Sequence, residues 1–358
     1  MILAFSGVIY DACMVNPEFM RRCLDLASRG RGRVGNGALV GAVFVRQGMI
    51  IAEGFHAAYG ASHAERALLD AYTGEILPED VLYVNLEPCC HQGKTPPCTN
   101  LLIEKGIKTV VYGMLDPDPR VSGQGVQALR AAGINVIGPL ERALCERMNR
   151  GFVSLRTKGR PWITLKQARD AQGAISNDDG SFKKITSADQ DAWSHTFLRA
   201  RHDAILVGVG SIISDNPLLN IRFAQIVKFS QMEGLNEDKI NENNFINPYR
   251  IVLDPQCRIP MDAKVVTDTP ERTIICFNEG QEQDEKALTL GGRGVHLVSL
   301  PMHDDAFNWE ALWRVLITPT ATFPGIASIL VEGGSRTWKE FQRALLVDEA
   351  IHLVGRFL

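Results

Sequence analysis

Four residues in the first third of the chain have types and spacing suited to metal-assisted hydrolysis. They stand as His63-Ala-Glu65, followed by Cys89 after a proline and then by Cys98. One imidazole and two thiolates are natural zinc ligands, and three protein ligands leave a fourth position for water. Zinc lowers the pKa of that water to about 7, and the nearby carboxylate of Glu65 is placed to shuttle its protons. The pattern is typical of zinc-dependent nucleobase deaminases, in which the glutamate is not a ligand.

Two other interpretations of these residues stay open at this point. Ser62-x-x-Glu65 is also a capping box, which alone explains the glutamate but not the two cysteines downstream. A structural zinc site is the main competitor, and Cys90 or His91 would then supply the fourth ligand. Adjacent cysteines rarely both face one metal, so we expect Cys90 to be a bystander. Replacing Glu65 with Gln separates the two kinds of zinc site, since only the deaminase then loses turnover.

The elements that position these residues alternate between helix and strand. Asn16-Pro17 marks a helix start, with the asparagine as N-cap. Ser62 is the expected N-cap of the helix that carries His63 and Glu65, and Cys98 begins another helix. Alternation of this kind predicts an α/β layer structure. In the first half we expect helices at 16–30, 62–71, 99–105, 126–132 and 140–149, and strands at 39–45, 49–54, 81–86, 109–112 and 134–137.

The second half predicts another α/β domain. A helix is expected at 187–199, and residues 224–247 are polar and rich in Asn and Glu, as in a surface insertion or mobile loop. No G-x-G-x-x-G fingerprint is visible, so a dinucleotide here would bind differently from a Rossmann fold. Domain limits are expected at 14–150 and 162–358, with 151–161 as a linker. Strands are expected at 162–166, 204–208, 250–254, 273–277, 295–300, 328–332 and 349–354.

Composition excludes several classes of protein. The chain has 358 residues, 45% hydrophobic and 22% charged, which is typical of a globular protein of two domains. The net charge of −3 gives no broad basic field for nucleic acid or an anionic membrane. No apolar run is long enough to cross a bilayer, and the opening residues lack the features of a signal peptide, with Met14 as an alternative start. Eight cysteines are too few for a disulfide scaffold in a chain of this length, so they favour a cytoplasmic protein.

The segment between the two cysteines indicates what kind of substrate the zinc site would bind. Eight residues separate Cys89 from Cys98, where nucleobase deaminases usually have two. The inserted residues include His91 and Lys94, and a lysine binds phosphate as a point charge. A substrate with its own phosphate is therefore expected.

At this point the chain resembles the bifunctional deaminase–reductases of riboflavin biosynthesis, from about Glu18 onward. The matching pieces include Val40-Gly-Ala-Val43, Gly54-Phe-His56, Leu86-Glu-Pro-Cys89, Gly93-Lys-Thr-Pro-Pro-Cys98 and Asp116-Pro-Asp-Pro119. The resemblance implies a cytidine-deaminase-like α/β/α domain that binds one zinc through His63, Cys89 and Cys98. It also implies a pyrimidine ribosyl phosphate as substrate, deaminated with Glu65 as the acid/base residue. The residues that would hold this substrate are Asn36, His56, His91, Lys94 and Asp116.

The second half resembles the reductase domain of the same family, which is similar in fold to dihydrofolate reductase. Its matching pieces include Asn149-Arg-Gly-Phe152, Gly159-Arg-Pro161, Gly208-Val-Gly-Ser211 and Val331-Glu-Gly-Gly334. The resemblance implies that NADPH reduces the ribosyl group to ribityl, in a chain that forms a homo-oligomer. The residues implied for the substrate are Lys166, Arg199, Asp215, Arg222 and Glu332. Those implied for NADPH are Thr186, Gly208, Gly210, Ser211, Gly333 and Gly334.

Some positions depart from the family pattern. Gly35-Asn36-Gly37 stands where the family has Pro-Asn-Pro, which predicts a less rigid loop. Residues 170–184 lack the usual reductase element, and the chain ends at Leu358, soon after its last expected strand. These departures leave two alternatives open, an active deaminase with a degenerate reductase domain and a deaminase of tRNA adenosine. The net negative charge argues against the deaminase of tRNA adenosine, because proteins that bind nucleic acid usually carry basic patches. A third alternative, a structural zinc site with a nucleotide-sensing second domain, makes no catalytic product.

Overall fold

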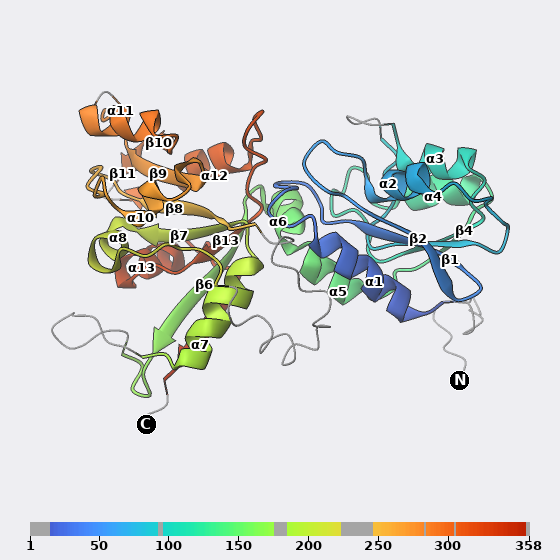
Figure 1. Ribbon diagram of the computed structural model, residues 1–358, viewed down its shortest axis with the longest axis horizontal. Helices are drawn as coiled ribbons and strands as arrows, with labels where there is room; N and C mark the ends of the chain where they lie inside the picture. Colours follow the sequence, from blue (N-terminus) through green and yellow to red (C-terminus); the bar gives the residue numbers. More distant parts are fainter. Residues whose placement is uncertain are drawn as a thin grey trace. The chain divides into compact units, whose positions relative to one another are not determined.

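The computed structural model describes residues 15–91, 96–174, 185–222, 246–282, 284–303 and 306–355. They form two compact units that divide between Lys158 and Gly159 (Figure 1). Each unit has a central sheet with buried clusters on both faces, so the expected α/β class is confirmed. None of the described helices combines the length and the apolar character that a membrane span requires.

The sheet of unit 1 has five strands in the order β2-β1-β3-β4-β5. β1 pairs antiparallel with β2 and β3, whereas β3, β4 and β5 run parallel. Gln47 and Gly48 form the tight turn between the first two strands, and both have positive φ. The strands are β1 (Gly41–Arg46), β2 (Met49–Phe55), β3 (Val81–Val84), β4 (Thr109–Tyr112) and β5 (Asn135–Ile137).

Alternating side chains of β1 show how the sheet of unit 1 is covered. Ala42 and Phe44 join one buried cluster with α2, α3 and α4, while Val43 and Val45 join another with α1, α5 and α6. Side chains of a strand point alternately to opposite faces, so helices cover both sides, as Figure 1 shows. The helices are α1 (Pro17–Ser28), α2 (Ala64–Ala71), α3 (Cys98–Glu104), α4 (Gln124–Ala131), α5 (Arg142–Met148) and α6 (Arg150–Lys158).

Residues 151–161, expected to form a linker, are helical for most of their length. Helix α6 places Phe152 in the buried cluster beneath α1, and Ser154 is also buried. The basic residues at the end of α6 made this segment look like a linker in the sequence. The apolar side of the helix nevertheless packs into unit 1. Only residues 159–161 lie between α6 and the first strand of unit 2.

The sheet of unit 2 has seven strands in the order β10-β9-β8-β7-β13-β6-β14, and all its pairings are parallel. The carboxyl ends of parallel strands lie at one edge of the sheet, where α/β proteins bind ligands. The strands are β6 (Trp162–Arg169), β7 (Ala204–Gly208), β8 (Tyr249–Leu253), β9 (Thr273–Asn278), β10 (His296–Leu300), β13 (Ser328–Val331) and β14 (Glu349–Val354). A separate two-stranded ribbon joins β11 (Met302–His303) to β12 (Ala306–Phe307).

Helices cover both faces of this second sheet. One buried cluster contains Leu206 of β7 with Trp313 of α12 and Phe341 of α13, and the other contains Val207 with Ile212 of α8 and Leu290 of α11. The helices are α8 (Val209–Asp215), α10 (Lys264–Thr267), α11 (Glu285–Gly292), α12 (Trp309–Ile317) and α13 (Ser335–Arg343), with a 3-10 turn η5 (Pro270–Arg272).

The helix expected at 187–199 is present in two parts. α7 (Ala188–Trp193) begins with a capping box between Ser187 and Gln190, and it continues into a π-helical turn, η1 (Ser194–Leu198). A π turn is rare and occurs often at functional sites. The expected insertion at 224–247 lies almost wholly outside the described residues.

Candidate functional site

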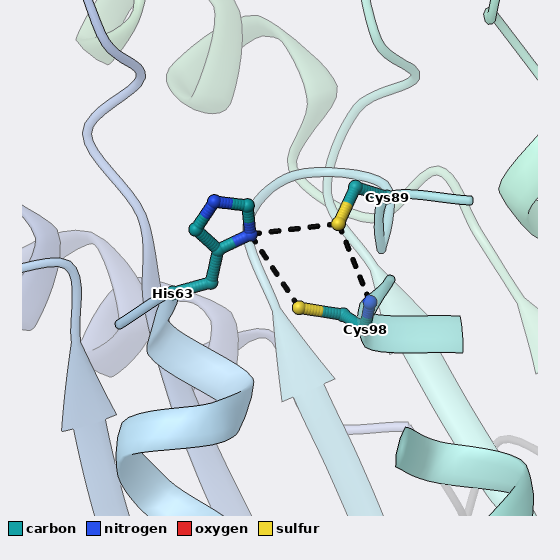
Figure 2. A group of neighbouring side chains, drawn as sticks. All are labelled: His63, Cys89 and Cys98. Atoms are coloured by element: carbon teal, nitrogen blue, oxygen red, sulfur yellow. Dashed lines mark hydrogen bonds between the residues drawn. The ribbon is translucent and has the colours of Figure 1, made fainter. Parts of the chain in front are cut away.

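The structure brings the three predicted zinc ligands together. His63 Nδ1 lies 3.5 Å from the Sγ of Cys89 and 3.5 Å from the Sγ of Cys98 (Figure 2). The three ligand atoms all lie within 4.8 Å of one another. Both sulfurs face the same ring nitrogen, so Nδ1 is the atom of His63 that the geometry offers to a metal.

The donor set fits zinc. Zn–N bonds of about 2.0–2.1 Å and Zn–S bonds of about 2.3 Å, in a tetrahedral arrangement, separate a ligand nitrogen from a ligand sulfur by about 3.6 Å. The two nitrogen–sulfur distances in this cluster are close to that value. The described part of the chain offers no fourth protein ligand in this cluster, which is the arrangement of catalytic zinc sites.

Helix α2 starts one residue later than the sequence predicts. His63 is the N-cap, with extended backbone (φ −64°, ψ 160°) and no side-chain cap, so Ser62 does not cap this helix. The Ser62 carbonyl is instead 3.0 Å from His56 Nδ1. The expected N-cap at Ser62 is therefore wrong, and the alternative explanation of Glu65 as part of a capping box does not hold.

Cys98 is the first residue of α3, as expected, and its backbone N–H donates to the Sγ of Cys89 at 3.3 Å. Hydrogen bonding from Cys98 first, and then from His63, lowers the pKa of the Cys89 thiol to about 4 despite its burial. The pKa of the Cys98 thiol is raised, because its bond to Cys89 and its burial favour the protonated form. A bound divalent cation reverses this preference, since a coordinating thiol loses its proton.

Glu65 is buried beside the cluster, with 3% of its surface exposed. Burial, and secondarily the charge of Cys89, raise the pKa of its carboxyl to about 7. A carboxyl group with this pKa gains and loses protons near neutral pH, as an acid/base catalyst must.

The other predicted deaminase residues surround this cluster where the structure describes them. The rings of His56 and His63 lie 5.7 Å apart, and the turn that carries Asn36 approaches His56 through Gly37. Burial lowers the pKa of His56, so its imidazole is neutral. His91 and Asp116 line a small pocket with Cys89 and Cys90, whereas Lys94 lies outside the described residues.

The backbone conformation of the turn at Gly35-Asn36-Gly37 explains why proline is absent from its first position. Gly35 has φ 58°, in the left-handed region that proline cannot enter. The Gly37 N–H donates to the Val34 carbonyl at 3.0 Å, which closes the turn. Loss of the two prolines is therefore accompanied by a different local backbone, with Asn36 kept at its centre.

Glu87 has a role that the sequence does not reveal. Its buried carboxylate accepts hydrogen bonds from the backbone N–H groups of Asp116 (3.0 Å), Gly123 (2.9 Å) and Val126 (3.1 Å). A Cβ at Gly125 would lie 2.1 Å from the Pro88 carbonyl oxygen, so the two segments pack without space for a side chain. The carboxylate thus fixes the loop that carries Asp116 against the loop that carries Cys89.

Comparison with known proteins agrees with this arrangement. Residues 15–114 match the model of the cytidine and deoxycytidylate deaminase zinc-binding region, and residues 161–356 match that of the RibD C-terminal domain. The chain is 36% identical over 342 residues to the riboflavin biosynthesis protein RibD of Aquifex aeolicus, which covers 95% of this chain and 87% of that one. It is 39% identical to RibD of Actinobacillus pleuropneumoniae, over 90% and 78% of the two chains.

The chain belongs to the RibD family. A RibD structure from Acinetobacter baumannii superposes with TM-score 0.75 and 30% identity, covering 96% of this chain and 87% of that one. The structure of a diaminohydroxyphosphoribosylaminopyrimidine deaminase/5-amino-6-(5-phosphoribosylamino)uracil reductase from Thermotoga maritima gives TM-score 0.74 and 34% identity, over the same shares. The protein is therefore a bifunctional enzyme of riboflavin biosynthesis, with a zinc-dependent deaminase domain and an NADPH-dependent reductase domain of the dihydrofolate-reductase-like fold.

In the RibD reductase domain, predicted residues gather at the carboxyl end of β13 and beside it in the middle of β6. Val331 pairs with Leu165, and Glu332 and Lys166 follow directly. Arg199 grips Glu332 through two hydrogen bonds of 3.1 and 2.7 Å, and both side chains are under one tenth exposed. Burial acts to raise the pKa of Glu332, but Arg199, aided by Lys166, lowers it to about 2. Arg199 also donates to the Asn220 carbonyl, so it is engaged within the protein.

The remaining substrate residues of this domain differ in their surroundings. Arg222 is exposed, and its guanidinium has no hydrogen-bond or ion-pair partner in the described ranges. Its backbone is held by η1, because its N–H donates to the His195 carbonyl at 3.0 Å and its carbonyl accepts from the Thr196 hydroxyl at 2.6 Å. Asp215 is exposed at the end of α8, and the described residues show no contact between it and the others.

The predicted cofactor glycines fall into two kinds. A Cβ at Gly208 would lie 3.0 Å, and one at Gly333 2.7 Å, from side-chain atoms of Thr337 in α13. Both glycines therefore leave room for the Thr337 side chain. Gly210 and Gly334 have open space around them. Ser211 lies in the first turn of α8, and the hydroxyl of Thr186 donates to Asp191.

Replacing Glu87 with Gln is expected to loosen the loop that carries Asp116. The amide nitrogen of glutamine cannot accept the backbone hydrogen bonds that one carboxylate oxygen now accepts, which costs about 1–3 kcal/mol. Hydrogen exchange should show faster exchange at Asp116, Gly123 and Val126, and the deaminase KM should rise. The matched control is Glu104→Gln, at an exposed position of α3. Unchanged exchange at those three amides would contradict this role.

Proposed function

We propose that the deaminase domain acts on 2,5-diamino-6-ribosylamino-4(3H)-pyrimidinone 5′-phosphate and that the reductase domain then reduces the ribosyl group of its product. The observation that carries the proposal is the cluster of His63 Nδ1 with two thiols at 3.5 Å, beside the buried carboxyl of Glu65. Family membership supports the choice of substrate, because the T. maritima relative is named for both reactions.

In the deaminase, His63, Cys89 and Cys98 would hold the zinc. When bound, zinc supplies a Lewis acid that makes water a nucleophile at neutral pH. Glu65 accepts a proton from the attacking water at its carboxylate and donates a proton to the departing ammonia. Its burial matches this task, since a carboxyl with a pKa of about 7 both accepts and returns a proton without a large free-energy step.

The substrate would be held by residues that differ in chemistry. His56 donates from Nδ1 to the Ser62 carbonyl, which leaves Nε2 as an acceptor for a ring N–H of the pyrimidine. Asn36, His91 and Asp116 would bind the remaining polar groups, and Lys94 the phosphate.

In the reductase, Lys166 and Arg222 would bind the substrate phosphate. Neither cation has a hydrogen-bond partner within the described residues, whereas Arg199 is committed to Glu332. We therefore assign Arg199 to positioning Glu332 beside the ribosyl group. NADPH supplies the hydride, and it would lie near Gly210, Ser211 and Gly334, with Thr186, Gly208 and Gly333 completing the cofactor site. Asp215 would bind the substrate.

The proposal also covers the domain limits, the cellular location and the oligomeric state. We assign the deaminase domain to residues 14–150, with α6 packed against it, and the reductase domain to 162–358, in a cytoplasmic homo-oligomer. Support for oligomerisation comes from β14, which pairs only with β6 among the described strands and so leaves one sheet edge available to a partner.

Glu65→Gln should keep the zinc and lose deaminase turnover. Glutamine preserves size and hydrogen bonding but cannot carry the proton, so the rate should fall by about 10²–10⁴-fold. Metal analysis and ammonia release measure the two quantities, with exposed Asp70→Asn on the same helix as control. A variant that retains turnover, or one that loses zinc, would refute this assignment.

Two neighbouring glycines separate a packing role from cofactor binding. Gly334→Ala places a methyl group in open space at φ −68°, so unit 2 should keep its stability while NADPH binds more weakly. Gly333→Ala pushes against Thr337, so thermal unfolding of unit 2 should shift to lower temperature. Thermal denaturation and NADPH titration test both variants. Unchanged NADPH affinity in Gly334→Ala would contradict the cofactor assignment.

A further inference from the structure

One half-buried imidazole near the reductase residues has no role in the chemistry described so far. His195 lies in the π turn η1, and its Nδ1 is buried without a hydrogen-bond partner in the described part of the chain. The hydroxyl of its neighbour Ser194 is in the same state. Buried polar atoms in native proteins nearly always have partners, so an unpaired ring nitrogen at this place requires an explanation.

The π turn connects His195 to the rest of the site. The same turn holds the backbone of Arg222 through the His195 carbonyl and the Thr196 hydroxyl. Arg199, four residues further, forms the buried ion pair with Glu332. The turn therefore places His195 in the same segment that holds the backbone of Arg222 and that precedes Arg199.

The charged groups around this imidazole come from several elements. Those that act on it are Arg199 from the same helical segment, Glu332 after β13, Arg222 before the undescribed segment, and Lys166 in β6. Burial first, and then Arg199, lower the pKa of His195 to about 4; Glu332 acts in the opposite direction, and Arg222 and Lys166 add to the lowering. The imidazole is therefore neutral in the free protein, surrounded by more positive than negative charge.

We propose that His195 is a further substrate-binding residue of the reductase site, whose ring N–H donates to the phosphate of the ribosyl phosphate between Lys166 and Arg222. This inference rests on the proposed function, which places the phosphate on those two cations. A bound phosphate dianion reverses the local field, so it favours the protonated imidazole and a second, charge-assisted hydrogen bond. His195 then takes up a proton as the substrate binds, and binding strengthens as the pH falls from 8 towards 6.

Steady-state kinetics of the full chain with the deaminated substrate test the role. His195→Gln should raise the reductase KM about tenfold at pH 7, because a hydrogen bond to a charged group is lost, with kcat little changed. The fall of the wild-type KM with pH should disappear in this variant. Thermal denaturation of unit 2 and the unchanged kcat report correct folding, and His296→Gln is the control, since that ring bonds the Glu271 carbonyl at the amino end of β10. Wild-type KM and pH profile in His195→Gln would overturn the inference.

A binding measurement separates this inference from the proposed function. In protein labelled at histidine, the His195 resonance, assigned through its loss in His195→Gln, should titrate at higher pH when ribose 5-phosphate is added. Lys166→Met and Arg222→Met should abolish that shift and NADPH oxidation. An unmoved resonance together with loss of reduction in those two variants overturns only the role of His195. Normal reduction by both variants overturns the proposed phosphate site, and the inference with it.

Discussion

The deaminase domain is organised by one distance, the 3.5 Å between a single imidazole nitrogen and each of two thiols. His63 ends the loop that enters α2, Cys89 follows β3, and Cys98 opens α3, so three separate segments must meet to make the cluster. The Cys98 N–H donates to the Cys89 sulfur, and Glu87 fixes the adjoining loop through three backbone hydrogen bonds. The ligand positions are thus formed by the protein itself, and the buried Glu65 beside them is ready to exchange protons.

The reductase domain relies on a different interaction, the buried pair of Arg199 and Glu332. Because Arg199 bonds Glu332 and the Asn220 carbonyl, we assign the phosphate to Lys166 and Arg222. The π turn η1 links both parts, since it contains His195, is followed directly by Arg199 and holds the backbone of Arg222. One local irregularity in a helix thereby connects the imidazole of His195, the backbone of Arg222 and, through Arg199, the carboxylate of Glu332.

Much of this structure follows from the sequence, and the exceptions have physical reasons. The bounds of β4, β7 and β14 agree with the predicted strands, because short apolar or alternating runs between turn residues specify strands locally. The zinc ligands are also predictable, since few other functions require that spacing. By contrast, the clamp by Glu87 and the contact of Thr337 with Gly208 depend on residues far apart in the sequence. The start of α2 after His63 rather than Ser62 is a local difference that the capping pattern did not predict. Arg199 was expected to hold substrate, and only the fold shows that it forms a buried ion pair with Glu332.

The most direct test of the account is the mass of the product formed from the diaminopyrimidine ribosyl phosphate by the purified chain, with and without NADPH. The account predicts that the deaminated compound forms without NADPH, and that the deaminated compound carrying a ribityl chain forms when NADPH is present. Appearance of only the deaminated compound under both conditions would contradict the reductase half, and an unchanged substrate would contradict the deaminase site itself.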